Sequence, residues 1–255
     1  MLMPNLPVCI RLDGKAFHAW TSGLERPFDA RLQRLFDETI KFLIEETNAT
    51  IGYTQSDEIT LILYNNQAPD SEVFFNGRCA KLTSVLASMA TAKYNALVPE
   101  ILPEKVGRLA LFDCRVWTVP SEQEAVNTLI WRELDATRNS VQMVAQSLYS
   151  HKQLHQKGIK ELQEMIFAKG INWNDYSDRC KKGGYFKRRS INRVFSTEEI
   201  EALPPEHEAR KNPGLLVTRH VISEISMPPL LRVKNRIGVV FCGDEVEEDG
   251  KNDAI

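Results

Sequence analysis

The sequence predicts an α+β fold: a ferredoxin-like βαββαβ antiparallel sheet with helices, followed by a helical and β-hairpin extension. Two observations carry this prediction. Short apolar runs typical of buried strands alternate with longer segments in which apolar residues recur at helical spacing, in the order β-α-β-β-α-β. Capping and turn residues then mark several helices and a hairpin in the second half of the chain.

Strands are predicted where short runs rich in β-branched or aromatic residues end at turn residues. Such runs lie at residues 8–12, 50–54, 59–64 and 109–116. The first run ends at Asp13-Gly14, and the second and third flank the short turn QSDE at residues 55–58. The second and third runs are therefore expected to form a hairpin beside the first strand.

Helices are predicted over residues 29–46 and 77–97, between these strands. Each segment carries apolar residues three or four positions apart, which places them on one helix face toward the sheet. In the first helix these residues are Leu32, Leu35, Phe36, Ile40 and Leu43. In the second helix they are Leu82, Val85, Leu86, Met89 and Ala90.

The second half of the chain is predicted to begin with a long helix. Ser121 and Glu124 have the spacing of a capping box, so this helix starts there and is expected to extend beyond Arg138. Another helix is predicted over residues 160–168, and a late strand over residues 215–225.

A basic hairpin is predicted around Gly183-Gly184, because a glycine pair is a common turn signal. Cations alternate with aromatic residues along this stretch, a pattern that suits a phosphate backbone with stacked bases. The cations are Arg179, Lys181, Lys182, Lys187, Arg188, Arg189 and Arg193. A charged hairpin that keeps an edge strand from pairing has the same pattern, so both interpretations stay open.

The composition excludes several classes of protein. The formal net charge is −2, so any contact with nucleic acid must come from a local basic face. None of the five cysteines forms a CxxC pair, which argues against a zinc site or a disulfide framework. No apolar run reaches the ~18 residues of a membrane helix. We expect a cytoplasmic protein without membrane contact.

Three acidic residues at strand ends are candidates for chemistry. Asp13 follows the first strand, and Asp57 and Glu58 lie in the hairpin turn. In a split βαβ sheet the first strand and the hairpin are neighbours, so these carboxylates converge at one edge. Carboxylates brought together repel unless a cation lies between them. Mg²⁺ prefers oxygen ligands, and two ions about 3.5–4 Å apart could hold both reacting oxygens of a phosphoryl transfer. Gly14 would let its carbonyl approach a metal closely.

Basic residues near these carboxylates could hold the phosphates of a nucleotide. The candidates are Arg11, Lys15, Arg26, Arg78 and Lys81. The last two are three positions apart and share a face of their helix. His18 lies in the loop after the first strand, where a lone histidine is more often a structural hydrogen-bonding residue than a catalyst.

Two blocks of the sequence, RLDGKAFHAW and GYTQSDEITLIL, resemble the tRNA-histidine guanylyltransferase superfamily of 3′-to-5′ polymerases. The stretches ALFDCRVWTVPS and WRELDATRNS extend the resemblance, which covers about residues 5–150 and weakens toward residue 240. It implies a polymerase- or cyclase-like palm as the catalytic core over residues 1–120. Residues 121–255 would form the helical and hairpin extension, packed on the palm in one structural unit. The resemblance also implies a homotetramer.

The resemblance implies roles for individual residues. Two Mg²⁺ ions would be held by Asp13, Asp57 and the carbonyl of Gly14, with Glu58 as a further catalytic residue. Nucleotide and triphosphate contacts would come from one group: Arg11, Lys15, Ala16, Phe17, His18, Arg26, Ser56, Arg78 and Lys81. We expect RNA contacts from a second group: Arg138, Asn139, Lys187, Arg188 and Arg189. Asp113 and Arg115 match an Asp-x-Arg of the family to which physical reasoning assigns no role.

The implied reaction adds nucleotides to the 5′ end of a tRNA. ATP or GTP first activates a 5′-monophosphate end as a 5′-5′ nucleotidyl adduct, and the 3′-hydroxyl of an incoming triphosphate then attacks that phosphate. Eukaryotic members that add G to tRNA-histidine carry His-Ile-Asn-Asn-Leu-Tyr-Asn after the matching Trp-Arg. This chain has TRNSVQM at residues 137–143, in which only Asn139 is kept. We therefore expect template-dependent 5′-end repair, with addition of G at position −1 of tRNA-histidine as the alternative.

Two other classes of function remain open. A nucleotide cyclase of the diguanylate type has Gly-Gly before its acidic pair, where this chain has Gln55-Ser56. Analysis of the products formed from GTP alone distinguishes this class. A non-catalytic RNA-binding module built on a decayed palm would show no metal-dependent turnover.

Overall fold

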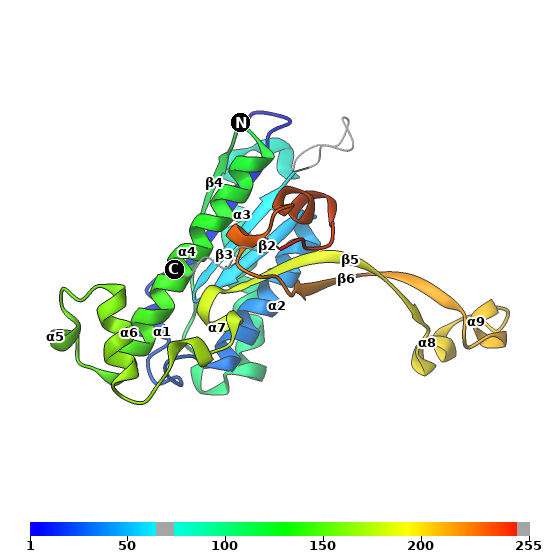
Figure 1. Cartoon of the computed structure of the whole chain (residues 1–255). Helices are drawn as coiled ribbons and strands as arrows, with labels where there is room; N and C mark the ends of the chain where they lie inside the picture. Colours follow the sequence, from blue (N-terminus) through cyan, green and yellow to red (C-terminus); the bar gives the residue numbers. More distant parts are fainter. Residues whose placement is uncertain (65–73, 249–255) are drawn as a thin grey trace.

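The computed structural model describes residues 1–64 and 74–248 and contains a six-stranded antiparallel sheet (Figure 1). The strands are β1 Val8–Gly14, β2 Ile51–Gln55, β3 Glu58–Leu63, β4 Phe112–Thr118, β5 Gly184–Val194 and β6 Leu216–Ile225. Their order across the sheet is β4-β1-β3-β2-β5-β6. The chain order β-α-β-β-α-β and the mixed architecture confirm the predicted α+β palm-like fold.

The helices begin close to the predicted capping residues. They are α1 Phe17–Trp20, α2 Ala30–Thr47, α3 Cys79–Ile101, α4 Glu122–Leu148, α5 His151–Leu154, α6 Ile159–Phe167, α7 Asp178–Lys182, α8 Thr197–Ala202 and α9 Glu208–Lys211. Ser121 caps α4 by accepting a hydrogen bond from the backbone amide of Glu124. Within residues 1–64 and 74–248, no helix combines the length and apolar character that crossing a bilayer requires.

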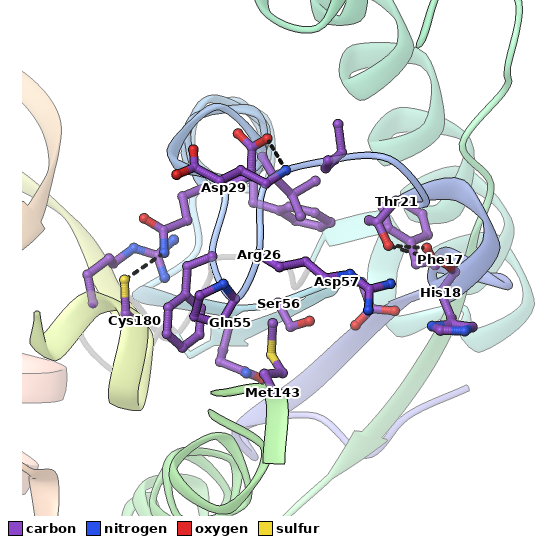
Figure 2. Close-up of a pocket in the computed structure, with 18 of the residues that line it drawn as sticks. Phe17, His18, Thr21, Arg26, Asp29, Gln55, Ser56, Asp57, Met143 and Cys180 are labelled. Atoms are coloured by element: carbon purple, nitrogen blue, oxygen red, sulfur yellow. Dashed lines mark hydrogen bonds between the residues drawn. The ribbon is translucent and has the colours of Figure 1, made fainter. Parts of the chain in front are cut away.

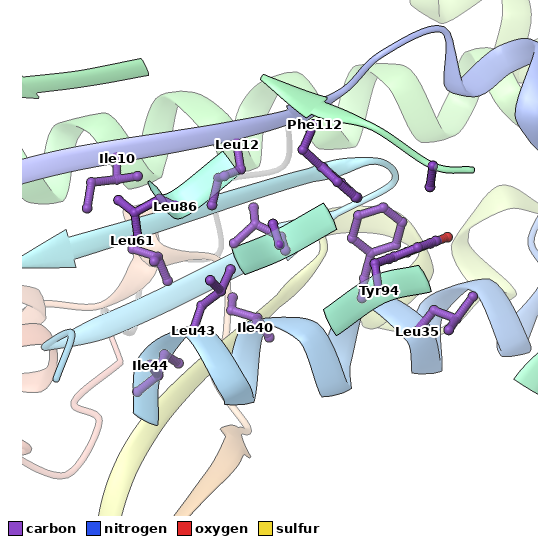
Figure 3. Packing of buried hydrophobic residues seen from close by; sticks show 14 of the residues in the cluster. Ile10, Leu12, Leu35, Ile40, Leu43, Ile44, Leu61, Leu86, Tyr94 and Phe112 are labelled. Carbon is purple, nitrogen blue, oxygen red and sulfur yellow. The ribbon is translucent and has the colours of Figure 1, made fainter. Parts of the chain in front are cut away.

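Successive side chains of β1 point to opposite faces of the sheet. Ile10 and Leu12 pack against α2 and α3 in the larger hydrophobic core (Figure 3). Cys9 lies on the other face, in the core formed with α4 and the C-terminal segment, residues 227–240. Arg11 and Asp13 have the same parity as Cys9 and therefore lie on the α4 side. The sheet thus has helices on both faces, and its polar candidates lie on the face that α4 covers.

A long hairpin arm extends from the sheet. β5 pairs with β2 only near its start, through Gly184, Tyr185 and Phe186. It pairs with β6 from Tyr185 opposite Ile225 as far as Val194 opposite Leu216. The arm projects away from the helices and carries α8 and α9 at its tip (Figure 1). These strands from the second half extend the sheet of the first half, and the division at residue 120 stays a prediction.

The glycine pair of the predicted basic hairpin does not form a turn. Gly184 is the first residue of β5, and the connection between β5 and β6 lies at α8 and α9. A Cβ atom at Gly183 would lie 2.7 Å from the backbone oxygen of Thr54. The glycine is therefore needed for close approach of the chain to β2, and the prediction of a turn at this place is wrong.

Candidate active site

Asp13 and Asp57 meet where β1 ends and the β2–β3 hairpin turns. The backbone amide of Gly14 donates a hydrogen bond of 3.0 Å to the backbone oxygen of Asp57, which ties the two segments together. Glu58 lies directly opposite Asp13 in the antiparallel register. The structure thus brings the three acidic residues selected from the sequence to one end of the sheet.

The backbone at this end is tightly constrained. A two-residue turn joins β2 and β3, and its first residue, Ser56, has a φ of 52°, a region that favours glycine. A Cβ atom at Gly14 would lie 2.2 Å from Cδ2 of Phe17, so only glycine fits there. The Phe17 ring packs in turn against Trp20 and Tyr94, with centroids 5.3 and 5.7 Å away. Packing below the loop therefore fixes the residues around Asp13.

The electrostatics of this end favour a bound cation. Asp57 is half-buried, and burial raises the pKa of its carboxyl group, which the nearby charge of Asp13 raises further. A cation between the two carboxylates would relieve this repulsion. The available donors are the Asp13 and Asp57 carboxylates and the Gly14 carbonyl, all hard oxygen ligands that fit Mg²⁺. No group of three or more His, Cys, Asp or Glu side chains that could hold a metal occurs in the described residues. Water and substrate phosphates would complete such a site.

Glu58 differs from the other two carboxylates because two arginines form close ion pairs with it. Arg132 on α4 donates through Nε and Nη2 to its two oxygens, at 2.6 and 2.7 Å. The Nη2 of Arg11 lies 2.6 Å from Oε2 of Glu58. Sequence reasoning missed Arg132, since only the fold brings it next to a residue 74 positions away. Its signals in the sequence were its place in the stretch WRELDATRNS, which extends the family resemblance, and the charged pair Arg-Glu among the apolar residues of a predicted helix.

A pocket of about 290 Å³ opens beside Asp57 (Figure 2). Four of the predicted nucleotide-binding residues line it: Phe17, His18, Arg26 and Ser56. Sequence reasoning missed other lining residues, among them Thr21, Gln33, Met143, Gln146 and Cys180. Two of these come from α4, and no sequence pattern pointed to them. The volume is near the lower end of the range for small-molecule sites.

The loop after β1 holds the predicted residues Lys15 and Ala16, and the neighbouring strand holds Asp113 and Arg115, to which the sequence assigned no role. The amide of Lys15 donates to the backbone oxygen of Leu111, while its side chain is exposed. Ala16 has a φ of 56° and precedes α1. Asp113 lies opposite Asp13 in the β1–β4 register, and the Nε of Arg115 is 3.6 Å from Oδ1 of Asp113.

Arg78 and Lys81 belong to the start of α3, a segment that lies at the end of the sheet opposite to α1 (Figure 1). They begin α3 directly after Gly77, whose carbonyl accepts a hydrogen bond from the amide of Leu2 at the start of the chain. α3 reaches the aromatic cluster below the active-site loop only at Tyr94, about 20 Å farther along the helix. Within this chain, the structure does not bring these two predicted triphosphate ligands to the acidic residues.

The predicted RNA-binding residues of the arm are not equivalent to one another. The Nζ of Lys187 donates to the carbonyls of Val239 and Val240, at 3.0 and 2.7 Å, and burial lowers its pKa. Arg188 pairs with Glu45 at 3.2 Å. Arg189 is exposed, and its side chain has no partner in the part of the chain that the structure describes.

The remaining predicted RNA-binding residues lie on α4. Arg138 is exposed and its Nη2 lies 3.2 Å from Asp135. The Nδ2 of Asn139 donates to the same carboxylate at 3.4 Å. Both side chains are therefore held by Asp135 at the surface of the helix that also supplies Arg132 and Met143.

Comparisons of the sequence and of the structure with known proteins match the same family. The family model described as "Thg1: tRNAHis guanylyltransferase" matches residues 1–120. The tRNA(His) guanylyltransferase of Eremothecium gossypii is 28% identical over 221 residues, which cover 79% of this chain and 91% of the relative.

Two solved structures are similar over almost the whole chain. A bacterial tRNA(His) guanylyltransferase (Thg1)-like protein in complex with ATP has a TM-score of 0.76 and 30% identity, covering 94% of this chain and 92% of that chain. A structure of the same description in complex with GTP has a TM-score of 0.71 and 30% identity, covering 94% and 91%. The similarity therefore includes the hairpin region as well as the first 120 residues.

Proposed function

The chain belongs to the tRNA(His) guanylyltransferase (Thg1) family of nucleotidyltransferases, and from this premise we propose that it adds G to the 5′ end of tRNA(His). One observation carries the proposal: Asp13 and Asp57 meet at the end of β1, beside a pocket that Asp57 itself lines. Carboxylates at this place can hold the cations that nucleotidyl transfer needs, and the pocket can hold part of a nucleotide.

The names of the relatives support G addition over template-dependent 5′-end repair, which the sequence alone favoured. The Eremothecium gossypii relative is named for tRNA(His), and the matching family model carries the same description. They also support a nucleotidyltransferase over the cyclase and over a non-catalytic module. Repair stays the second candidate because residues 137–143 lack the His-Ile-Asn-Asn stretch.

The proposed reaction consists of two transfers. In the first, an oxygen of the RNA 5′-phosphate attacks the α-phosphorus of ATP or GTP, and pyrophosphate leaves. In the second, the 3′-hydroxyl of GTP attacks the activated 5′-phosphate, loses its proton, and displaces the nucleoside monophosphate. Both transfers place several phosphate anions at one end of the sheet, so both need positive charge there.

Different residues of the site would bind the metal ions and the phosphates. Asp13, Asp57 and the Gly14 carbonyl would hold two Mg²⁺ ions, which when bound would offset the charge of the phosphates. Arg26 and His18 line the same pocket as Asp57 and would donate hydrogen bonds to the triphosphate. The homotetramer stays a prediction, and light scattering at micromolar concentration tests it.

The test of this proposal is transfer to defined RNAs. The protein is incubated with ATP, GTP, Mg²⁺ and a 5′-monophosphorylated tRNA(His) that lacks G at position −1. We expect one G at the 5′ end. Several other tRNAs, each lacking its first nucleotide, are assayed in parallel. If these are extended by the nucleotide that pairs with the 3′ strand, repair is the better description. If no RNA is extended, the proposal is wrong.

A further inference from the structure

A series of ion pairs connects α4 to β1 beside the two candidate metal ligands. Arg132 binds both oxygens of Glu58, at 2.6 and 2.7 Å. Glu58 also pairs with Arg11 on β1 at 2.6 Å. On its other side, Arg132 lies 3.0 Å from Asp135. Charges from β1, β3 and α4 therefore alternate in sign along one continuous row.

The central pair of this row is buried. Arg132 is 7% exposed and Glu58 is 5% exposed, so little water screens the attraction between them. The guanidinium engages the carboxylate through two parallel hydrogen bonds, a geometry that fixes orientation as well as distance. Neither side chain can turn away without breaking this buried, two-bonded ion pair. Glu58 is consequently held in one position.

Arg132 lies on a part of α4 that is itself anchored. The next residue, Glu133, accepts a hydrogen bond of 2.7 Å from the Tyr185 hydroxyl and one of 3.1 Å from the Leu230 amide. These bonds tie α4 to β5 and to the C-terminal segment. The guanidinium of Arg132 is therefore presented from a fixed helix rather than from a mobile one.

Arg11 is the member of the row whose partner can change. Its Nη2 lies 2.6 Å from Glu58 but 3.7 Å from Oδ1 of Asp13. Its side chain is 22% exposed, which leaves it room to move. Among the described residues, Asp13 is the other carboxylate within 4 Å of Arg11, so without Glu58 in place the arginine can pair closely with it. Such a pair would occupy the carboxylate needed for the cation.

We propose that Arg132 is a positioning residue, which fixes Glu58 so that Glu58 keeps Arg11 from pairing closely with Asp13. The inference rests on the proposed nucleotide transfer, because it explains how Asp13 stays available for that reaction. It also gives Glu58 a role as an internal anchor for two arginines instead of a metal ligand.

The test compares single and double neutralisation of the buried pair. Arg132→Gln, Glu58→Gln and the double variant are measured for thermal unfolding and for kcat and KM with GTP and tRNA. Arg34→Gln is the matched control, because Arg34 pairs with Glu100 at 2.8 Å on the exposed surface. Arg132→Lys keeps the charge but loses the two parallel hydrogen bonds.

Each single variant is expected to lower both the Tm and kcat, the latter by ~10²-fold, which is the loss that a misplacement of about 1 Å can cause. The double variant should regain most of the Tm, because no unpaired buried charge remains. Its kcat should stay as low as that of the single variants, since Arg11 still turns to Asp13. Arg132→Lys should lie between wild type and Arg132→Gln, and Arg34→Gln should match wild type.

Two results would overturn the inference while the wild type is active. One is a double variant whose kcat recovers together with its Tm, because the pair would then serve folding alone. The other is a double variant whose loss equals the product of the single losses, because the two residues would then act separately. A wild type that transfers no nucleotide at all would instead overturn the proposed function, and this inference with it.

Discussion

The acidic end of the sheet and the hairpin arm both carry charges that stand out in the sequence, but the fold uses these charges in different ways. At the acidic end Glu58 is enclosed by arginines, while Asp13 and Asp57 remain available beside the pocket. On the arm, Lys187 is bound to backbone carbonyls and Arg189 is exposed. The elements packed against a charged residue, rather than its neighbours in sequence, decide whether it can meet a substrate.

Loss of either available carboxylate should have the largest effect on activity. Asp13→Ala and Asp57→Ala are each expected to lower nucleotide transfer by at least ~10³-fold, because no neighbouring group replaces a lost cation ligand. Circular dichroism should show an unchanged fold. Asp175→Ala, at an exposed residue that does not line the pocket, is the matched control and should keep full activity. Near-normal turnover in either active-site variant would contradict the assignment.

A second change tests whether packing holds the acidic end in place. Gly14→Ala is expected to cost ~1–3 kcal/mol of unfolding free energy, because its Cβ would overlap the Phe17 ring. The double variant Gly14→Ala/Phe17→Leu removes part of that ring and should regain some of the loss. Gly158→Ala, where the nearest atom lies 3.8 Å away, should be close to neutral. Chemical denaturation measures all three, and an equal cost for Gly14→Ala and Gly158→Ala would contradict the account.

The arm is tested by separating its bound lysine from its free arginine. Lys187→Met should lower the unfolding free energy by ~1–3 kcal/mol, because it removes two hydrogen bonds to backbone carbonyls. Arg189→Gln should leave stability unchanged and weaken tRNA binding. The slope of log affinity against log salt concentration should become smaller by about one. Similar effects of both substitutions on RNA affinity would show that the two side chains are equivalent after all.

The smallest expected effect concerns pH and the repulsion between the two carboxylates. The pKa of Asp57 is raised in the folded protein by burial and by Asp13, so the folded state binds this proton more tightly than the unfolded state. In the absence of metal, this group therefore adds stability as pH falls from neutral toward its unfolded pKa. Unfolding free energies of wild type and Asp57→Asn should converge over that range. A constant difference between them would contradict the repulsion.

Much of the fold follows from local patterns in the sequence. The alternation along β1 separates Ile10 and Leu12 from Arg11 and Asp13, and Ser121 marks the start of α4. These features could be predicted because they depend on residues a few positions apart. The convergence of the acidic residues followed from the strand order of a split βαβ sheet.

Other features depend on contacts between distant segments and left no local pattern. The pairing of Arg132 with Glu58 spans 74 positions. The glycine at position 183 reflects close packing against Thr54, which in the sequence looks the same as a turn. Arg78 and Lys81 have the spacing of a phosphate-binding pair, but α3 places them at the far end of the sheet. Charge type and spacing indicate what a residue can bind, and the fold decides what it meets.

The most direct test of the central claim, that Asp13 and Asp57 hold the divalent cations, is a count of bound Mn²⁺ in place of Mg²⁺. Electron paramagnetic resonance measures the ions bound per chain in the presence of a non-hydrolysable GTP analogue. The account predicts two ions for wild type and for Asp175→Asn, and fewer for Asp13→Asn and Asp57→Asn. Undiminished Mn²⁺ binding by both active-site variants would contradict it.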